Sequence, residues 1–239
     1  MGTLPRVPLV TELLARRVRA DGSSPLVTYY DTDSGARTEL SATTLENWVA
    51  KTTNLLADEL LVSPGDAVEL VVAEHDPGHW MTLVWALACW RSGAVVTLGR
   101  PDEAVVVVCG PAYEGVEHGT AELVSCSLHP LGLGLGTVAP GVVDYALEVR
   151  AQPDRAGSAE LGPQDPAWRD AERELDQAGL LDGPTGPAHR SLVRPGDPWA
   201  TVRDAVVRPL RDGGSSVVLR GDADEERVRQ VVTAERVDA

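Results

Sequence analysis

Apolar and polar residues alternate along the chain in short blocks, and the spacing within each block predicts its secondary structure. Apolar positions between Leu9 and Val18 share one helical face, which predicts a first helix. Two β-like runs follow, at 26–31 and 36–40, and the turn formers between them predict a β-hairpin.

The next segment predicts a helix followed by a buried strand. Apolar residues keep helical spacing from Leu45 to Leu60, and Thr43 with Glu46 fits a capping box at the start of this helix. The run 68–73 is apolar on both faces, which is typical of a strand in a parallel sheet that is covered from both sides.

A second helix and a second buried strand complete a βαβ unit. Asp76 is the expected helix cap, with Pro77 at the first helical position, and the helix is expected to end near Gly93. The strand expected at 94–98 follows at once. A strand, a helix and a strand with such short joints form a parallel βαβ unit.

The pattern weakens in the second half of the chain. We expect a strand at 104–109, a further strand within 121–130, a loop at 131–140 and a short helix at 141–150. Proline, glycine and acidic residues then dominate as far as 198, with one weak helix around 167–180. Regular structure returns as a helix at 199–211, a strand at 216–219 and a helix at 223–235 that Asp222 would cap.

These elements predict an α/β fold, a three-layer αβα arrangement around a mostly parallel sheet. Residues 1–150 form the α/β region, and residues 151–198 form an acidic, Pro/Gly-rich excursion or a partly disordered linker. Residues 199–239 supply a helix, a strand and a helix that complete the same domain.

The charge of the chain excludes two classes of partner. The 239 residues include 36 Asp and Glu against 21 Lys and Arg, which gives a formal net charge of −15. A field of this sign repels phosphate backbones and anionic lipid headgroups, so neither a nucleic acid nor a membrane surface is an expected partner.

Three features predict a cytoplasmic protein. The three cysteines, Cys89, Cys109 and Cys126, are odd in number and far apart, which favours a reducing compartment and core positions over a disulfide or thiolate-zinc framework. The N-terminal arginines follow the apolar residues, the reverse of the order in a secretory signal. The longest apolar run, 80–90, is shorter than the about 20 residues that cross a bilayer.

Four sequence pieces, in order, resemble the N-terminal part of the AMP-binding, adenylate-forming enzymes, which include the acyl-CoA synthetases. They are the hairpin 27–31 leading to 40–41, the first long helix, the Ser-Pro-Gly-Asp-Ala-Val entry into a strand at 63–68, and the helix-to-strand joint Ala-Leu-Ala-Cys-Trp-Arg-Ser-Gly-Ala-Val-Val at 86–96. A fifth piece, 209–219 with Ala-Glu-Arg-Val at 234–237, resembles a later Gly-Gly–strand segment. More narrowly, the chain resembles a short, uncharacterised actinobacterial family distantly similar to the N-terminal subdomain of these enzymes.

The resemblance implies a truncated scaffold that lacks the family's chemistry. Gly183, Thr185 and Gly186 occupy positions similar to the enzymes' phosphate loop, but Asp182 adds a like charge and no loop lysine follows. Lys51, the sole lysine, lies far away in the sequence. Neither the magnesium-holding glutamate segment nor the C-terminal lid domain is recognisable, so we expect no catalytic residue and no metal. The alternative is that these residues form an ordinary Gly/Pro/Thr loop within an acidic linker.

Other candidate sites are weak. The run Leu131–Gly136 has G-x-G-x-G spacing rather than that of a nucleotide loop, so a flexible connector is expected. His75 and His79 have zinc-like spacing without a third ligand, and solvated surface histidines explain them better. The tryptophans on the two central helices favour core packing, the alternative being an aromatic-lined cleft for an acyl or aryl group.

Two functions follow from this picture. The first is a non-catalytic relative of adenylate-forming enzymes that acts as a binding or interaction module, with an unknown protein partner and no cofactor. The second is residual binding of an adenine nucleotide (ATP or AMP) or an acyl ligand, as part of an adenylating or acyl-CoA ligase activity that a partner chain completes. The first is favoured because no positive charge is expected beside residues 183–186, where a triphosphate would be held.

Overall fold

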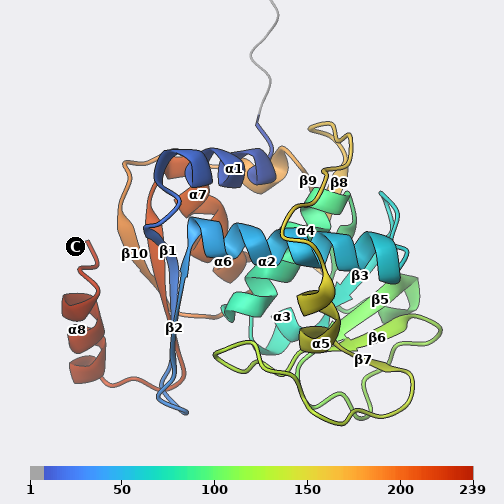
Figure 1. The fold of residues 1–239 in the computed structure, drawn as a ribbon. Helices are drawn as coiled ribbons and strands as arrows, with labels where there is room; N and C mark the ends of the chain where they lie inside the picture. The colour runs from blue at the N-terminus through green and yellow to red at the C-terminus, as the bar shows by residue number, and fades with distance from the viewer. Residues whose placement is uncertain (1–7, 239) are drawn as a thin grey trace, which may run out of the picture.

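Two β-sheets face each other across a layer of helices in the computed structural model, which describes residues 8–238 (Figure 1). The first seven residues, which are part of the stretch that argues against a secretory signal, lie outside the described residues.

The smaller sheet combines strands from the N-terminal and C-terminal parts of the chain. Its strand order is β10-β11-β1-β2. These strands are β1 (Pro25–Asp31), β2 (Arg37–Ser41), β10 (Arg190–Val193) and β11 (Ser215–Arg220). The predicted hairpin is confirmed, because β1 and β2 pair antiparallel. The other side of β1 pairs in parallel with β11, about 190 residues later in the sequence, with Tyr29 opposite Val218.

The larger sheet has the order β7-β6-β5-β3-β4-β8-β9 and is parallel except for its last pair. Its strands are β3 (Ala67–Leu70), β4 (Val95–Thr97), β5 (Ala104–Cys109), β6 (Glu122–Ser125), β7 (Val142–Asp144), β8 (Pro166–Arg169) and β9 (Glu174–Asp176). The predicted α/β class with mostly parallel strands is confirmed. The strands form two sheets rather than one, since in the described part of the chain β1, β2, β10 and β11 pair only with one another. The pairing of β1 with β11 joins distant parts of the chain, so a local sequence pattern does not reveal it.

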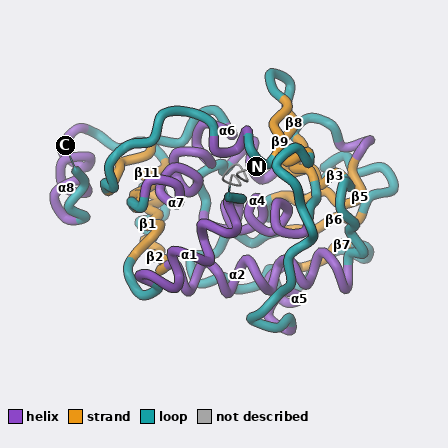
Figure 2. The backbone as a smooth tube through the Cα atoms, turned by 90° about the horizontal axis from the view of Figure 1, so that it is seen from above, coloured by secondary structure: helices purple, strands orange, loops and turns teal. Residues whose placement is uncertain are grey.

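The helices pack mainly between the two sheets, and α8 lies on the outer side of the smaller one (Figure 2). They are α1 (Val10–Asp21), α2 (Ala42–Asn54), α3 (Val71–His75), α4 (Trp80–Ser92), α5 (Tyr145–Ala151), α6 (Pro198–Val202), α7 (Arg208–Asp212) and α8 (Glu225–Ala234). A π-helical segment, Leu55–Glu59, extends α2, and another, Arg203–Val207, joins α6 to α7. Short 3₁₀ turns occur at Pro101–Glu103 and Gly179–Leu181.

The central helix α4 is buried on every side from Trp80 to Arg91. A helix that is apolar all round belongs inside a protein rather than on its surface. The indole N–H of Trp90 donates to the Ala167 carbonyl (3.0 Å), and that of Trp85 donates to the Cys126 sulfur (3.2 Å). These tryptophans therefore serve the core, as the core-packing interpretation predicts.

Three predicted helix caps are wrong. Ser41, not Thr43, caps α2 by accepting from the Thr44 amide (3.1 Å). The cap of α4 is His79, whose Nδ1 accepts from the Met81 amide (3.1 Å). At α8, Asp224 replaces the predicted Asp222. In each case the chain enters its helix at a residue that sequence spacing alone did not single out.

Two other residues of the predicted caps, Glu46 of the capping box and Asp76, have partners elsewhere. Glu46 forms an ion pair with the buried Arg91 (2.6 Å), so it does not complete a capping box. Asp76 accepts from Arg220 (2.9 Å), the last residue of β11 in the smaller sheet. Long-range ion pairs of this kind leave no trace in the local sequence pattern.

Three predicted elements differ in type. In the helix predicted at 141–150, Val142–Asp144 form strand β7 and the helix begins only at Tyr145. The run 68–73 leaves the sheet after Leu70 and continues as α3, because a short apolar run suits a strand and a buried helical turn equally well. The predicted helix at 167–180 is instead the β8–β9 hairpin. Its turn forms because Asp170 Oδ1 accepts from the amides of Glu172 (2.8 Å) and Arg173 (2.9 Å), which competes with helix formation.

The three cysteines are unpaired and buried, in agreement with the core interpretation. Between residues 8 and 238, no helix combines the length and the apolar character that crossing a membrane requires.

A partly buried carboxylate attaches the C-terminal helix to the smaller sheet. Glu235, just after α8, accepts from Tyr30 (2.5 Å), Arg37 (2.9 Å) and Arg190 (2.7 Å). Burial alone would raise the pKa of Glu235, but these hydrogen bonds outweigh it and lower the pKa to about 2. The carboxylate therefore stabilises the fold only while it is ionised.

We predict that Glu235→Gln lowers the free energy of unfolding at pH 7 by about 2 kcal/mol, since each pKa unit corresponds to about 1.4 kcal/mol and part of the gain is screened. The folded-state pKa lies below the unfolded one, so the contribution is full above about pH 4.5 and is lost as the pH falls toward 2. Urea titrations at pH 7 and pH 3 measure it. Glu172→Gln, in an exposed pair with Arg173, is the control and should change little. Equal losses in the two variants would contradict the prediction.

Candidate functional site

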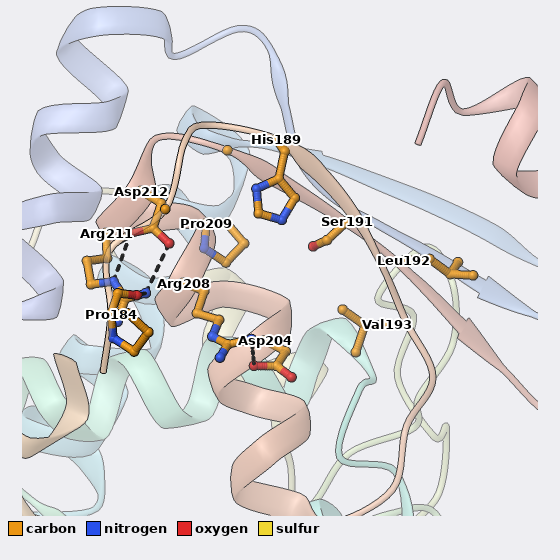
Figure 3. A pocket seen from close by; sticks show the side chains of 12 residues that line it. Pro184, His189, Ser191, Leu192, Val193, Asp204, Arg208, Pro209, Arg211 and Asp212 are labelled. Atoms are coloured by element: carbon orange, nitrogen blue, oxygen red, sulfur yellow. Dashed lines mark hydrogen bonds and ion pairs between the residues drawn. The ribbon is translucent and has the colours of Figure 1, made fainter. Parts of the chain in front are cut away.

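The predicted phosphate-loop residues lie on an exposed loop between the last 3₁₀ turn and β10. Gly186 and Pro184 line a cavity of about 260 Å³ together with His189 and residues of α7 (Figure 3). Gly183 has a φ of +114°, a conformation that glycine adopts without strain. Thr185 is exposed beside them. The three predicted residues are therefore close together on one loop, and their role in binding phosphate stays a prediction.

Arg211 of α7 holds this loop by its backbone carbonyls. Its guanidinium donates to the carbonyls of Leu181 (3.2 Å), Asp182 (3.3 Å) and Pro184 (2.7 Å). The same guanidinium is paired with Asp212 at 2.8 Å, which lowers the pKa of that carboxyl. The positive charge nearest the loop is thus committed to neighbours within the protein.

A second arginine, Arg208, lines the same cavity and pairs with Asp204 at 3.2 Å (Figure 3). The expectation that no positive charge lies beside residues 183–186 is therefore wrong, since two arginines do. The i, i+4 spacing of Asp204 and Arg208 on the predicted helix 199–211 was the sequence signal for this pair. Which end of that helix meets the loop was not visible in the sequence.

A larger cleft, about 620 Å³, opens where strands of both sheets end. Its walls include residues at or just beyond the carboxyl ends of β1, β3, β5 and β11. In the larger sheet β4 lies on one side of β3 and β5 on the other, so successive strands are added first in one direction and then in the opposite direction. This switch in strand order lies beside the cleft. In open α/β sheets ligands bind at such switch points.

One guanidinium and three carboxylates meet at the rim of this cleft. Arg220, the last residue of β11, donates to Asp31 (2.9 Å), Asp33 (3.0 Å) and Asp76 (2.9 Å). Burial would raise the pKa of Asp31, but hydrogen bonds from Ser34 and Arg220 outweigh it and keep the carboxyl ionised. The cluster joins the ends of β1 and β11 to the turn before α4 and is negative overall.

The two histidines with zinc-like spacing differ in their surroundings. His75 is exposed, as expected, but His79 is buried, so the expectation of a solvated side chain is wrong for it. Burial lowers the pKa of His79 to about 4, which leaves the ring neutral at pH 7. Within residues 8–238 no three His, Cys, Asp or Glu side chains are grouped so as to hold a metal.

The connector 131–136 packs tightly at two of its three glycines. A Cβ on Gly132, which has a φ of +63°, would lie 2.9 Å from the Trp48 ring. The amide of Leu135 donates to Asp144 (2.7 Å). A Cβ on Gly134 would lie 2.7 Å from Asp144 Oδ2, whereas nothing lies within 4 Å of one on Gly136, so packing explains two of the three glycines of this run.

Comparison with known proteins identifies the family. No protein-family model matches the chain. A protein of Mycobacterium tuberculosis described as a TIGR03089 family protein is 32% identical over 244 residues, which cover 94% of each chain. The chain belongs to the TIGR03089 family.

Solved structures confirm the fold of this TIGR03089 protein. An acyl-CoA synthetase from Brucella canis superposes with a TM-score of 0.76 at 17% identity, over 99% of this chain and 48% of the synthetase. The N-terminal domain of FACL13 from Mycobacterium tuberculosis gives a TM-score of 0.71 at 13% identity, over 97% of this chain and 62% of that domain. The TIGR03089 chain therefore has the fold of acyl-CoA synthetase N-terminal domains and spans about half of the Brucella enzyme.

We predict that Arg211→Ala releases the loop of this TIGR03089 protein. It removes three hydrogen bonds to loop carbonyls and should lower the free energy of unfolding by about 1–2 kcal/mol. Hydrogen exchange at residues 183–186 should accelerate. The matched control is Arg208→Ala, which removes a half-exposed pair and should leave exchange in the loop unchanged. Equal acceleration in both variants would show that Arg211 does not hold the loop.

Proposed function

We propose that this TIGR03089 protein is a non-catalytic relative of adenylate-forming enzymes that binds a small organic molecule in the cleft between its two sheets. The observation that carries the proposal is the cleft of about 620 Å³ at the carboxyl ends of β1, β3, β5 and β11. Its lining combines apolar side chains with a few polar groups, which is the usual composition of small-molecule sites.

The charges beside residues 183–186 support a non-catalytic role. Transfer of a nucleotide phosphate requires cations that face the phosphate oxygens. Arg211 and Arg208 are instead paired with Asp212 and Asp204. The sole lysine, Lys51 on α2, pairs with Asp154 at 2.9 Å and so is engaged with the segment after α5.

A second function, residual binding of ATP, AMP or an acyl ligand, has one observation in its favour. Arg208 and Arg211 line the cavity of about 260 Å³ together with Gly186 of the loop. Rearrangement of their ion pairs would free positive charge for a phosphate group. A partner chain would then have to supply the remaining groups for an adenylating or acyl-CoA ligase activity.

Nucleotide assays separate the two functions. We predict that the isolated protein catalyses no ATP–pyrophosphate exchange and that ATP, AMP and acyl-CoA leave its melting temperature unchanged. A ligand at 100 times its Kd would stabilise the fold by about 2.7 kcal/mol, an easily measured shift. Stabilisation by ATP that is lost in Arg211→Ala would favour the second function, and pyrophosphate exchange would contradict the first.

Occupation of the cleft has its own test. We predict that 3-phenylpropanol, a neutral probe with an apolar body, binds with a millimolar Kd, as about 0.3 kcal/mol per heavy atom implies. NMR titration should shift resonances of residues that line the cleft. Ala112→Trp would fill the cleft mouth and abolish these shifts, whereas Ala171→Trp, in the exposed β8–β9 turn, would not. Binding that survives Ala112→Trp would place the ligand elsewhere.

A further inference from the structure

The wall of the cleft contains a tyrosine whose hydroxyl has no hydrogen-bond partner within residues 8–238. Tyr29 of β1 is only 4% exposed, and its ring meets that of His79 edge-on at 4.9 Å. Over residues 8–238, no donor or acceptor forms a hydrogen bond with the Tyr29 hydroxyl, although the residue lines the cleft. The hydroxyl oxygen is not among the fully enclosed polar atoms of the described residues, so it is accessible from the cleft and can hydrogen-bond a molecule bound there.

An uncommitted carboxylate oxygen lines the same cleft. Asp76 uses Oδ1 to accept from Arg220, and in the described part of the chain no donor reaches its Oδ2. By contrast, Asp31 uses both oxygens, since Oδ1 accepts from Arg220 and the Asp33 amide and Oδ2 accepts from Ser34. Asp76 therefore supplies the free acceptor of this cluster.

The electrostatic field in the cleft favours a cation. Arg220 is the arginine of the lining, and the carboxylates of Asp31, Asp33 and Asp76 surround it. Burial keeps His79 neutral, and its Nδ1 accepts from the Met81 amide. An anion placed beside Arg220 would meet three carboxylates at close range, whereas a cation would be attracted.

The remaining wall is apolar. Val71 and Val72 of α3, Val116, and Leu128 and Pro130 of the loop after β6 line the cleft. A ligand that matched only the polar end would leave these side chains in contact with water. The lining as a whole therefore suits a molecule with an apolar body and one charged end.

We propose that the cleft binds a primary amine carried on an apolar body, with its ammonium group between Asp76 Oδ2 and the Tyr29 hydroxyl oxygen. Both atoms accept hydrogen bonds, and an ammonium group offers only donors. The inference rests on the proposed binding function and specifies its ligand class. It excludes carboxylate-bearing acyl compounds from this cleft.

Three probes of equal length test the inference: 3-phenylpropylammonium, 3-phenylpropanol and 3-phenylpropionate. Isothermal titration and NMR at constant low ionic strength measure each Kd. We expect the ammonium probe to bind at least tenfold more tightly than the alcohol, and the carboxylate to bind more weakly than either. Charge-assisted hydrogen bonds are about twice as strong as neutral ones, which is the basis of this order.

Variants locate the ammonium group. Asp76→Asn should reduce the preference for ammonium over alcohol to about twofold or less, because the neutral amide keeps the shape but loses the charge. Tyr29→Phe, which keeps the ring, should weaken the ammonium probe several-fold and provides a second readout should Asp76→Asn fail to fold. Glu172→Gln is the control: Glu172 is an exposed carboxylate in the β8–β9 turn, pairs with Arg173 and does not line the cleft, so the preference should persist.

Two outcomes would overturn the inference, and they differ in what they say of the proposed function. Equal binding of the three probes, or tightest binding of the carboxylate, contradicts the amine class but leaves a ligand-binding cleft, provided that Ala112→Trp abolishes binding of the alcohol. Failure of all three probes to bind at millimolar concentration contradicts both.

Discussion

Burial of α4 on every side is the constraint on which the rest of the structure depends. A helix with twelve consecutive buried residues must be covered from all directions, and the chain supplies α2, α1 and strands of the larger sheet for this purpose. The larger sheet does not cover the helix alone, because α2, α1 and the π-helical segment Leu55–Glu59 also pack against it. The cleft forms where the strand ends of the two sheets approach each other.

Local patterns predicted the elements well where one face or two faces of a segment were apolar. The hairpin 26–40, the long helices from 45 and 199, and the strands at 94 and 104 all have clear periodicity, and all are present. The failures share a physical cause. Val71–Ala73 and 167–180 have local preferences that long-range packing or an aspartate turn overrides, and the cap of α4 is a histidine, which capping rules do not include.

The candidate sites were harder to predict, because ion pairs between distant segments define them. Gly183, Thr185 and Gly186 could be found from their resemblance to a known loop, but Arg211, which holds that loop, is 25 residues beyond Gly186. Asp31, Asp76 and Arg220 come from three parts of the chain, and no local motif joins them. In parallel α/β folds the strand ends that meet are set by strand order, which depends on the complete topology.

The same chemical logic distinguishes the two cavities. Beside residues 183–186 each arginine has a carboxylate neighbour at close range. A phosphate group would have to displace one of these ion pairs, and its own attraction to the arginine would have to exceed the energy of the broken pair. In the cleft one guanidinium, that of Arg220, is surrounded by three carboxylates, so the excess charge there is negative. A scaffold of the acyl-CoA synthetase fold thus presents acceptors rather than donors at its larger cleft. In the proposed amine site, the Tyr29 hydroxyl and Asp76 Oδ2 are the two acceptors that this cleft offers to a bound molecule.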